Sequence, residues 1–276
     1  MTAQQAPLIT HIYPKNADPE SYKLLHQLSR EFCETKNNGQ ATQPAMILAF
    51  DKPLGMTSFQ LVAKIRWILT RMWGVKKVKV GHAGTLDPLA TGVMIICTGK
   101  ATKCIEQLQA GVKEYEATLQ LGATTPSFDL EHPIDQTYPT THITEEAIRE
   151  VLPTFVGDIM QVPPVYSACK IEGKRAYDLA RQGKAEEVEL KAKPLRIDEI
   201  ELTHLDLDNM QITIRVVCSK GTYIRALARD IGEALHSGAH LTALRRTRVG
   251  AIDEQKCFSI EAFEQEYLPK QTDVTR

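Results

Sequence analysis

The segment from Gly81 to Gly92, GHAGTLDPLATG, contains the residues best suited to chemistry. Its three glycines and one proline specify an unusual backbone, because glycine adopts positive φ angles and proline restricts φ. A loop shaped in this way can approach a ligand closely. Asp87 is its only carboxylate, and it is flanked by leucines. A carboxylate in partly apolar surroundings is poorly solvated and therefore more reactive, provided that a cation keeps it ionised.

Asp87 also has a purely structural interpretation. Asp followed by Pro commonly starts a helix, with Asp as the N-cap and Pro at the first helical position. On spacing alone this interpretation is favoured, so the loop by itself does not establish a catalytic site.

The cysteines and histidines give little support to a metal or cofactor site. None of the six cysteines forms a CxxC pair, so we expect small buried residues instead of zinc ligands or disulfides. His236 and His240 are one close pair at helical spacing, and two ligands do not make a metal site. The sequence has no P-loop, no GxGxxG motif after a strand and no HExxH motif. We therefore expect neither a metal nor a cofactor.

Charge is divided along the chain, although the net charge of the 276 residues is only −1. Residues 51–115 contain ten Lys or Arg against four Asp or Glu, and residues 215–248 contain seven against two. Residues 116–157 contain one basic residue against seven acidic ones. The net charge of −1 excludes a protein that coats nucleic acid by bulk charge, but the two basic segments still allow a local basic groove for a phosphate backbone. Ordinary solvated charged faces are the alternative.

Strands and helices that would position these residues are mixed along the chain. Strands are predicted at four places: 45–50, 93–97, 115–121 and 212–218. Helices are predicted at three places: 58–71, 144–152 with Thr144 as N-cap, and 223–235. Because there is no regular strand–helix–strand period and no internal repeat, the predicted fold class is α+β.

The two ends of the chain differ from its centre. Residues 1–45 are predicted to be an N-terminal extension with one amphipathic helix and a linker, and residues 251–276 a short C-terminal tail. No apolar run approaches the roughly 20 residues that span a bilayer. The N-terminus has the features of neither a signal peptide nor a transit peptide, so we expect a cytoplasmic protein.

Four separated motifs follow one another in a definite order. DKPLGMTS at 51–58 precedes the Asp87 loop, Lys113-Glu114-Tyr115 follows it, and CSKGTYIR occupies 218–225. In this combination the sequence resembles the TruB-type tRNA pseudouridine synthases from about residue 46 to residue 250. The resemblance implies a pseudouridine-synthase-like fold with a mixed, largely antiparallel central sheet flanked by helices and loops. It also implies isomerisation of uridine to pseudouridine at position 55, in the T-arm loop of tRNA.

The resemblance gives Asp87 the catalytic role, with Tyr115 and Arg225 beside it. The reaction breaks the C1′–N1 bond, turns the base and joins C5 to C1′, so it needs no redox change and no cofactor. The carboxylate could attack C1′ or C6 or remove the C2′ proton, and the sequence does not choose among them. Arg225 could pair with Asp87 and keep it ionised, or contact phosphate. Tyr115 could stack on the flipped base and move the C5 proton.

The remaining implied residues would bind RNA, since the stacked target base must be flipped out. His82 resembles a position that touches the RNA where the base used to lie. Tyr223 is the second aromatic residue of the pocket, and Leu244 resembles its apolar wall. Without the motifs, Tyr115 and Leu244 would be ordinary structural residues. The last three candidates are two phosphate contacts and a residue that shapes the neighbouring loop: Lys52, Lys103 and Pro53.

Residues of about 160–190 resemble the family's RNA-gripping insertion. Its basic residues would face phosphate: Lys170, Lys174, Arg175, Arg181 and Lys184. A solvated hairpin is the alternative, because Glu186, Glu187 and Glu189 cancel this charge locally.

The sequence also departs from the family. Residues 124–129, TTPSFD, differ from the Thr-Asp-rich version that the family would have. Only 26 residues follow Gly250, too few for the small RNA-binding PUA domain of many members. We expect tRNA as the partner, no membrane, no obligate protein partner and a monomer. An RNA chaperone and a ribosomal-RNA isomerase are the competing hypotheses, and the retained Asp87 favours an enzyme.

Overall fold

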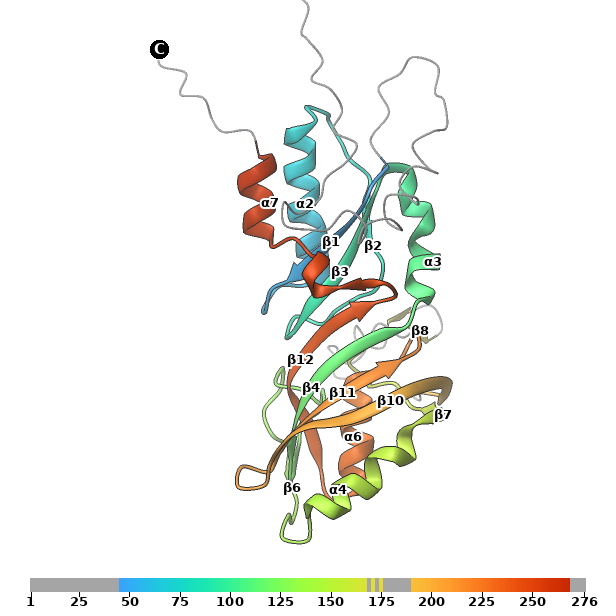
Figure 1. The fold of residues 1–276 in the computed structure, drawn as a ribbon, viewed down its shortest axis with the longest axis vertical. Helices are drawn as coiled ribbons and strands as arrows, with labels where there is room; N and C mark the ends of the chain where they lie inside the picture. The colour runs from blue at the N-terminus through green and yellow to red at the C-terminus, as the bar shows by residue number, and fades with distance from the viewer. Residues whose placement is uncertain (1–44, 168–169, 172–173, 176–189, 269–276) are drawn as a thin grey trace, which may run out of the picture. The chain divides into compact units, whose positions relative to one another are not determined.

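The computed structural model describes residues 45–167, 170–171, 174–175 and 190–268 (Figure 1). These residues form two compact units. The first unit contains residues 45–111 and the C-terminal part from Arg246 onward, and the second unit contains residues 112–245.

The sheet of the first unit is built on β3 (Ala90–Thr98), whose residues from Val93 to Thr98 are almost completely buried. Two strands pair with β3 in antiparallel orientation: β1 (Ile47–Lys52) and the short β2 (Val80–His82). The end of β12 (Ala239–Val249) also belongs to this unit, and β13 (Ile252–Asp253) pairs with it. The apolar runs that predicted strands thus form the middle of this sheet.

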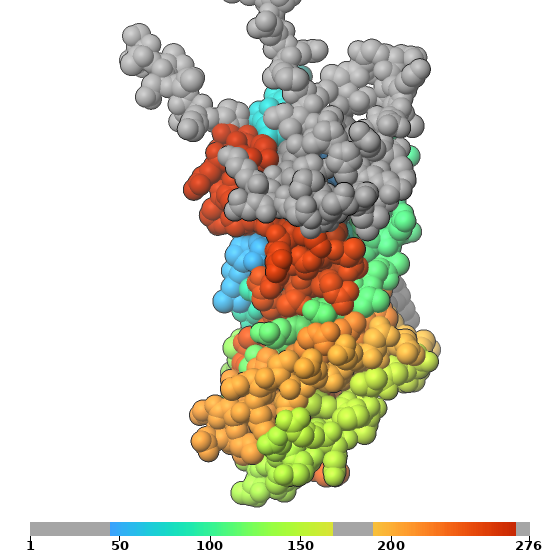
Figure 2. Space-filling view, in the orientation of Figure 1, coloured from blue at the N-terminus to red at the C-terminus, as the bar shows by residue number. Residues whose placement is uncertain are grey.

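Helices of the first unit pack around this sheet. They are α2 (Ser58–Met72), η2 (Gly99–Cys104), α3 (Ile105–Ala110), η5 (Glu254–Lys256) and α7 (Ile260–Tyr267). Thr57 caps α2 in a reciprocal capping box with Gln60. The ring of Phe263 on α7 packs edge-on against Phe50 of β1, with 5.0 Å between centroids. Figure 2 shows residues near the C-terminus (red) lying against residues near the start of the described chain (blue). The region predicted to be a C-terminal tail therefore folds onto the first unit as far as residue 268.

The second unit has an antiparallel sheet in the order β12, β4 (Lys113–Leu121), β11 (Gln211–Cys218), β10 (Lys193–Asp206) and β7 (Gly157–Gln161). Its helices are α4 (Glu145–Val151), η3 (Leu152–Phe155) and α6 (Ile224–Ala234). Two small pairings complete it: β5 (Ala123–Thr124) with β6 (Gln136–Thr137), and β8 (Lys170–Ile171) with β9 (Lys174–Arg175).

The predicted fold class, mixed α+β with a largely antiparallel sheet, is confirmed. Each predicted strand and helix of the central region is present, and Thr144 caps α4 by accepting a hydrogen bond from Ala147 N–H at 3.2 Å. The helical spacing of His236 and His240 was misleading, because α6 ends at Ala234 and His240 lies on β12. Among the described residues, no helix is long and apolar enough to cross a membrane.

Candidate active site

The loop that contains Asp87 leads into β3 through a tight turn. Ala90 N–H donates to the Asp87 carbonyl at 3.1 Å, so the Asp-Pro pair forms a turn and the helix-start interpretation is wrong. Gly84 and Gly92 have φ angles of 114° and 100°, which non-glycine residues rarely adopt. A Cβ atom at Gly92 would also collide with the Arg246 carbonyl. Gly84 and Gly92 are therefore required by the conformation of this loop, as predicted, whereas Gly81 does not have a positive φ.

The start of α2 holds this loop on both sides of Asp87. Ser58 Oγ donates to the Leu86 carbonyl at 2.8 Å and accepts from Leu86 N–H at 2.9 Å. Gly55 N–H donates to the Pro88 carbonyl at 2.9 Å. The residues before and after Asp87 are thus fixed, while Asp87 itself is only half-buried. Ser58 was missed as a site residue, although it lies in one of the four motifs.

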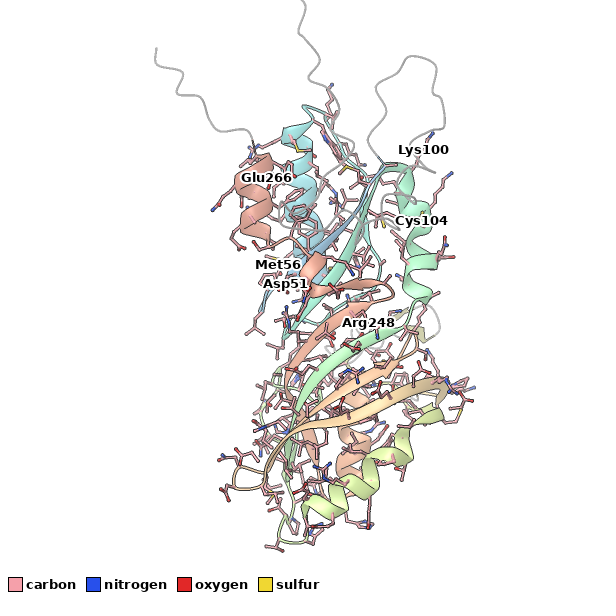
Figure 3. All side chains as sticks on the ribbon, in the orientation of Figure 1. Asp51, Met56, Lys100, Cys104, Arg248 and Glu266 are labelled. Carbon is pink, nitrogen blue, oxygen red and sulfur yellow. The ribbon has the colours of Figure 1, made fainter. Side chains whose placement is uncertain are left out.

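Lys52 lies beneath the same loop and has a different role from the predicted phosphate contact. Its side chain is 0% exposed, and Nζ donates to the carbonyls of Met56 (2.6 Å), Pro53 (2.9 Å) and Pro88 (3.3 Å). Figure 3 labels Asp51 and Met56 close together at this end of β1. Burial lowers the pKa of Lys52 to about 8, and the nearby Asp87 carboxylate opposes that shift. Lys52 therefore supports the loop from inside.

Arg246 is a second buried cation at the loop. Its side chain is 1% exposed, Nε donates to the Val93 carbonyl at 2.7 Å, and one terminal nitrogen donates to the Gly84 carbonyl at 3.3 Å. Its role was not predicted, and the only sequence signal was its place in the second basic segment. Together, Lys52 and Arg246 place two positive charges at the loop of Asp87.

The other predicted residues of the first unit lie at different distances from this loop. His82 ends β2 and is half-buried, and burial lowers the pKa of its imidazole. Pro53 is exposed in the connection between β1 and α2. Lys103 is exposed in η2, beyond the opposite end of β3. That strand is about 27 Å long at 3.4 Å per residue. Any phosphate that Lys103 contacts is therefore different from one beside Asp87.

In the second unit, the start of α6 positions Tyr223 and Arg225. Tyr223 is the N-cap residue, and the side chain of Gln161 binds its backbone on both sides. Gln161 Oε1 accepts from Tyr223 N–H at 2.9 Å, while Gln161 Nε2 donates to the Tyr223 carbonyl at 3.2 Å. Gln161 is 1% exposed, so this connection between β7 and α6 is a buried one.

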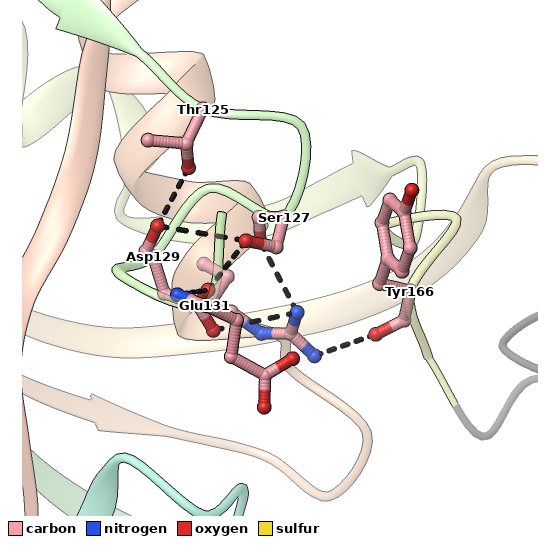
Figure 4. A network of polar contacts seen from close by, with 6 residues as sticks. Thr125, Ser127, Asp129, Glu131 and Tyr166 are labelled. Carbon is pink, nitrogen blue, oxygen red and sulfur yellow. Dashed lines mark hydrogen bonds and ion pairs between the residues drawn. The ribbon is translucent and has the colours of Figure 1, made fainter. Parts of the chain in front are cut away.

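Arg225 is held in a buried polar network (Figure 4). Its guanidinium donates to the carbonyls of Tyr166 (2.8 Å) and Ser127 (3.1 Å) and lies 3.6 Å from Asp129 Oδ2. Ser127 Oγ donates to the other oxygen of Asp129 at 2.5 Å, and Thr125 Oγ1 donates to the Asp129 carbonyl at 2.7 Å. Asp129 was missed because its segment departs from the expected pattern.

Tyr115 and Leu244 occupy strands of the second unit. Tyr115 lies on β4 opposite Val216 and is 9% exposed, while Leu244 on β12 is half-buried. Asp87 belongs to the first unit and Arg225 to the second, so the predicted pairing of the two stays a prediction.

Of the insertion's basic residues, Lys170, Lys174 and Arg175 lie on β8 and β9. Arg181 and Lys184 fall outside the described residues.

The cysteines lie outside the Asp87 loop in the sequence. Among the described cysteines, Cys97, Cys104 and Cys218 are buried, as predicted, while Cys257 is half-buried. Burial raises the pKa of Cys218 to about 11, so this thiol is a poor nucleophile. Within the described residues no three His, Cys, Asp or Glu side chains are grouped to hold a metal ion.

Comparison with known proteins places the chain in a family. Residues 70–224 match the pattern of the TruB family pseudouridylate synthase N-terminal domain, and residues 225–275 match that of the tRNA pseudouridylate synthase B C-terminal domain. The chain is 68% identical over 225 residues to a tRNA pseudouridine synthase B of Phocaeicola vulgatus, covering 82% of this chain and 94% of that protein. It is 46% identical over 223 residues to one of Mycobacterium bovis, covering 80% and 72%.

A solved structure agrees with this assignment. The archaeal box H/ACA sRNP Nop10–Cbf5 complex contains a similar chain, with a TM-score of 0.57 and 28% identity over 82% of this chain. The match covers 54% of the archaeal chain, so this chain spans about half its length. Because the family patterns cover the Asp87 loop and the start of α6, the chain belongs to the TruB family of pseudouridylate synthases, isomerases that convert uridine to pseudouridine.

Proposed function

We propose that this chain isomerises the uridine at position 55 in the T-arm loop of tRNA, with Asp87 as the catalytic residue. The relatives named tRNA pseudouridine synthase B support tRNA as the substrate. The four motifs whose resemblance led to position 55 lie in the two units that contain Asp87 and Arg225. We also propose that the protein acts in the cytoplasm as a monomer.

The observation that best supports this function is the rigid support of Asp87. Hydrogen bonds hold Leu86 and Pro88 on either side of it, and its own side chain is left half-buried. Such support keeps a reacting group in one geometry and avoids reorganisation during the reaction. Two buried cations, Lys52 and Arg246, donate hydrogen bonds to backbone carbonyls of the same loop.

The proposed reaction uses this carboxylate without a cofactor. The C1′–N1 bond breaks, C5 joins C1′, and the proton leaves C5 while N1 gains one, so atoms and electrons balance. Asp87 attacks C1′ or C6, forming a bond that breaks again before the product leaves, or it removes the C2′ proton and returns it after C5 joins C1′. Tyr115 stacks on the flipped base and transfers the C5 proton. Arg225, which Asp129 and two carbonyls hold in position, pairs with Asp87.

The remaining site residues are proposed to hold the RNA. His82 stacks where the target base was before flipping, and its lowered pKa favours a neutral ring. Tyr223 and Leu244 line the pocket for the flipped base. Pro53 shapes the connection beside Asp87, and Lys103 contacts a phosphate distant from the reacting nucleotide.

A mapping experiment tests this proposal. An unmodified tRNA transcript is incubated with the protein, treated with carbodiimide and read by primer extension. A stop at the T-loop uridine is expected, and the Asp87→Asn variant should give none. A stop at another uridine would contradict the position, while binding without any stop would favour the RNA chaperone.

A further inference from the structure

Two apolar side chains beside the Asp87 loop are unusually exposed. Phe59 is 71% exposed and Leu54 is 66% exposed, the highest values among the large hydrophobic residues described. A single exposed apolar residue needs no explanation in a soluble protein. These two, however, flank one short stretch at the start of α2, which is the stretch that holds the loop of Asp87.

The backbone that presents both side chains is fixed to this loop. Leu54 precedes Gly55, whose N–H donates to the Pro88 carbonyl at 2.9 Å. Phe59 follows Ser58, whose hydroxyl makes both hydrogen bonds to Leu86. Phe59 also lies in the first turn of α2, which the capping box of Thr57 and Gln60 stabilises. The backbone at Leu54 and Phe59 is therefore fixed to the backbone on either side of Asp87, and a ligand that contacts these side chains orders little additional backbone.

Another exposed aromatic residue on the same helix has different surroundings. Trp67 is 40% exposed, and its ring is covered by Arg71 at 4.0 Å and Lys64 at 5.1 Å from the centroid. For Phe59, no cation or ring contact exists within the described part of the chain. The 71% exposed ring can thus take a planar ligand near the loop that contains Asp87.

An unpaired nucleobase is the planar ligand that fits this position. Flipping a nucleotide toward Asp87 separates it from its stacked neighbours, so unpaired bases lie next to the site during the reaction. Every base has a π face that an aromatic side chain can stack on, independent of its hydrogen-bonding edge. The basic segment of residues 51–115 would attract the same RNA strand through its phosphates.

We propose that Phe59, with Leu54 beside it, stacks on an unpaired base that neighbours the target uridine and holds the RNA strand during base flipping. This inference rests on the proposed function, because it takes Asp87 as the point where the flipped nucleotide reacts. Phe59 is accordingly a substrate-binding residue and not a catalytic one.

Substitutions at Phe59 test the proposal on the full chain. Phe59→Ala should raise the RNA concentration for half-maximal single-turnover rate by about 5- to 150-fold, the range expected for one base–aromatic stack. Phe59→Trp should stay within about threefold of the wild type, while Phe59→Leu, which is apolar but not planar, should resemble Phe59→Ala. Trp67→Ala is the matched control on the same helix and should change the value by less than about twofold. Because the Phe59 side chain is exposed, the thermal unfolding midpoints of the three Phe59 variants should differ from that of the wild type by less than about 2 °C.

T-arm hairpins with one abasic nucleotide then identify the stacked base. At one position beside the target, removal of the base should weaken the wild type and leave Phe59→Ala unaffected. The proposal is wrong if Phe59→Ala or Phe59→Leu binds as the wild type does, or if all abasic positions weaken both proteins equally. The mapping experiment on the wild type tests the proposed function separately from the stacking role of Phe59. A primer-extension stop at the T-loop uridine preserves the proposed function even when substitution of Phe59 has no effect.

Discussion

Ser58 and Leu86 form two hydrogen bonds with each other, through one hydroxyl and both backbone groups of the leucine, at 2.8 and 2.9 Å. Ser58 is the first residue of α2 and 5% exposed, and Leu86 directly precedes Asp87. The pair therefore links the start of a helix to the position of the carboxylate.

Replacement of Ser58 by Ala should lower turnover more than stability explains. It leaves the N–H and carbonyl of Leu86 without their buried partner, which costs about 1–3 kcal/mol of unfolding free energy. Displacement of Asp87 should reduce the single-turnover rate at least about tenfold, with little change in tRNA affinity. The control is Ser259→Ala, which removes the N-cap hydrogen bond of α7 and costs about 1 kcal/mol. Equal turnover in both variants would refute the positioning role.

The Asp87→Asn variant should bind tRNA and fail to modify it. The amide has nearly the same shape as the carboxylate and leaves the turn to Ala90 intact, but it is neither a nucleophile nor a base. Turnover below about one per cent of wild type is expected, with affinity within about tenfold, which is 1.4 kcal/mol. Asp208→Asn, a charge loss at an exposed turn, should keep full turnover. Substantial turnover by Asp87→Asn would contradict the catalytic assignment.

The buried Lys52 predicts a specific dependence of stability on pH. Its pKa is about 8 in the folded protein against an ordinary 10.5, because burial disfavours the charged form. Between these values the unfolded state holds a proton that the folded state has released, so this group makes the free energy of unfolding rise with pH. From pH 7.5 to pH 10.5 the free energy of unfolding of the wild type should therefore rise relative to that of Lys52→Met by on the order of 2 kcal/mol. Denaturant unfolding across that range measures it, and a constant difference would contradict the burial of a titrating ammonium.

Loss of the Asp129 carboxylate should weaken both the fold and the reaction. The side chains of Arg225 and Asp129 are only 6% and 7% exposed, and removal of one partner of a buried pair costs about 3–5 kcal/mol. Asp129→Asn should also reduce turnover at least about tenfold, because Arg225 loses the group that orients it. The control is Glu201→Gln, which removes an exposed partner of Arg215 and should cost less than about 1 kcal/mol. If Asp129→Asn behaves like this control, the two carbonyls alone hold Arg225.

Local patterns predicted part of the secondary structure, whereas β7, β10, β12 and α7 were not predicted. The apolar runs became β1, β3 and β11, and the alternation in residues 115–121 became a strand with alternating burial. The need for glycine at positions 84 and 92 was also visible, because positive φ is a property of one residue and its neighbours. These features depend on interactions within a few residues, and the sequence displays such interactions directly.

The roles of the buried polar residues were decided only by the tertiary structure. Lys52 looked like a surface cation, yet it is enclosed, and one of its carbonyl partners, Pro88, is 36 residues away. Arg246 reaches Val93 across 153 positions, and Arg225 reaches Ser127 across 98. Spacing alone favoured a helix start at Asp87-Pro88, whereas the structure has a turn in which Ala90 N–H donates to the Asp87 carbonyl. Sequence determined which residues are reactive, whereas long-range packing determined which of them are exposed to substrate, because burial depends on distant parts of the chain.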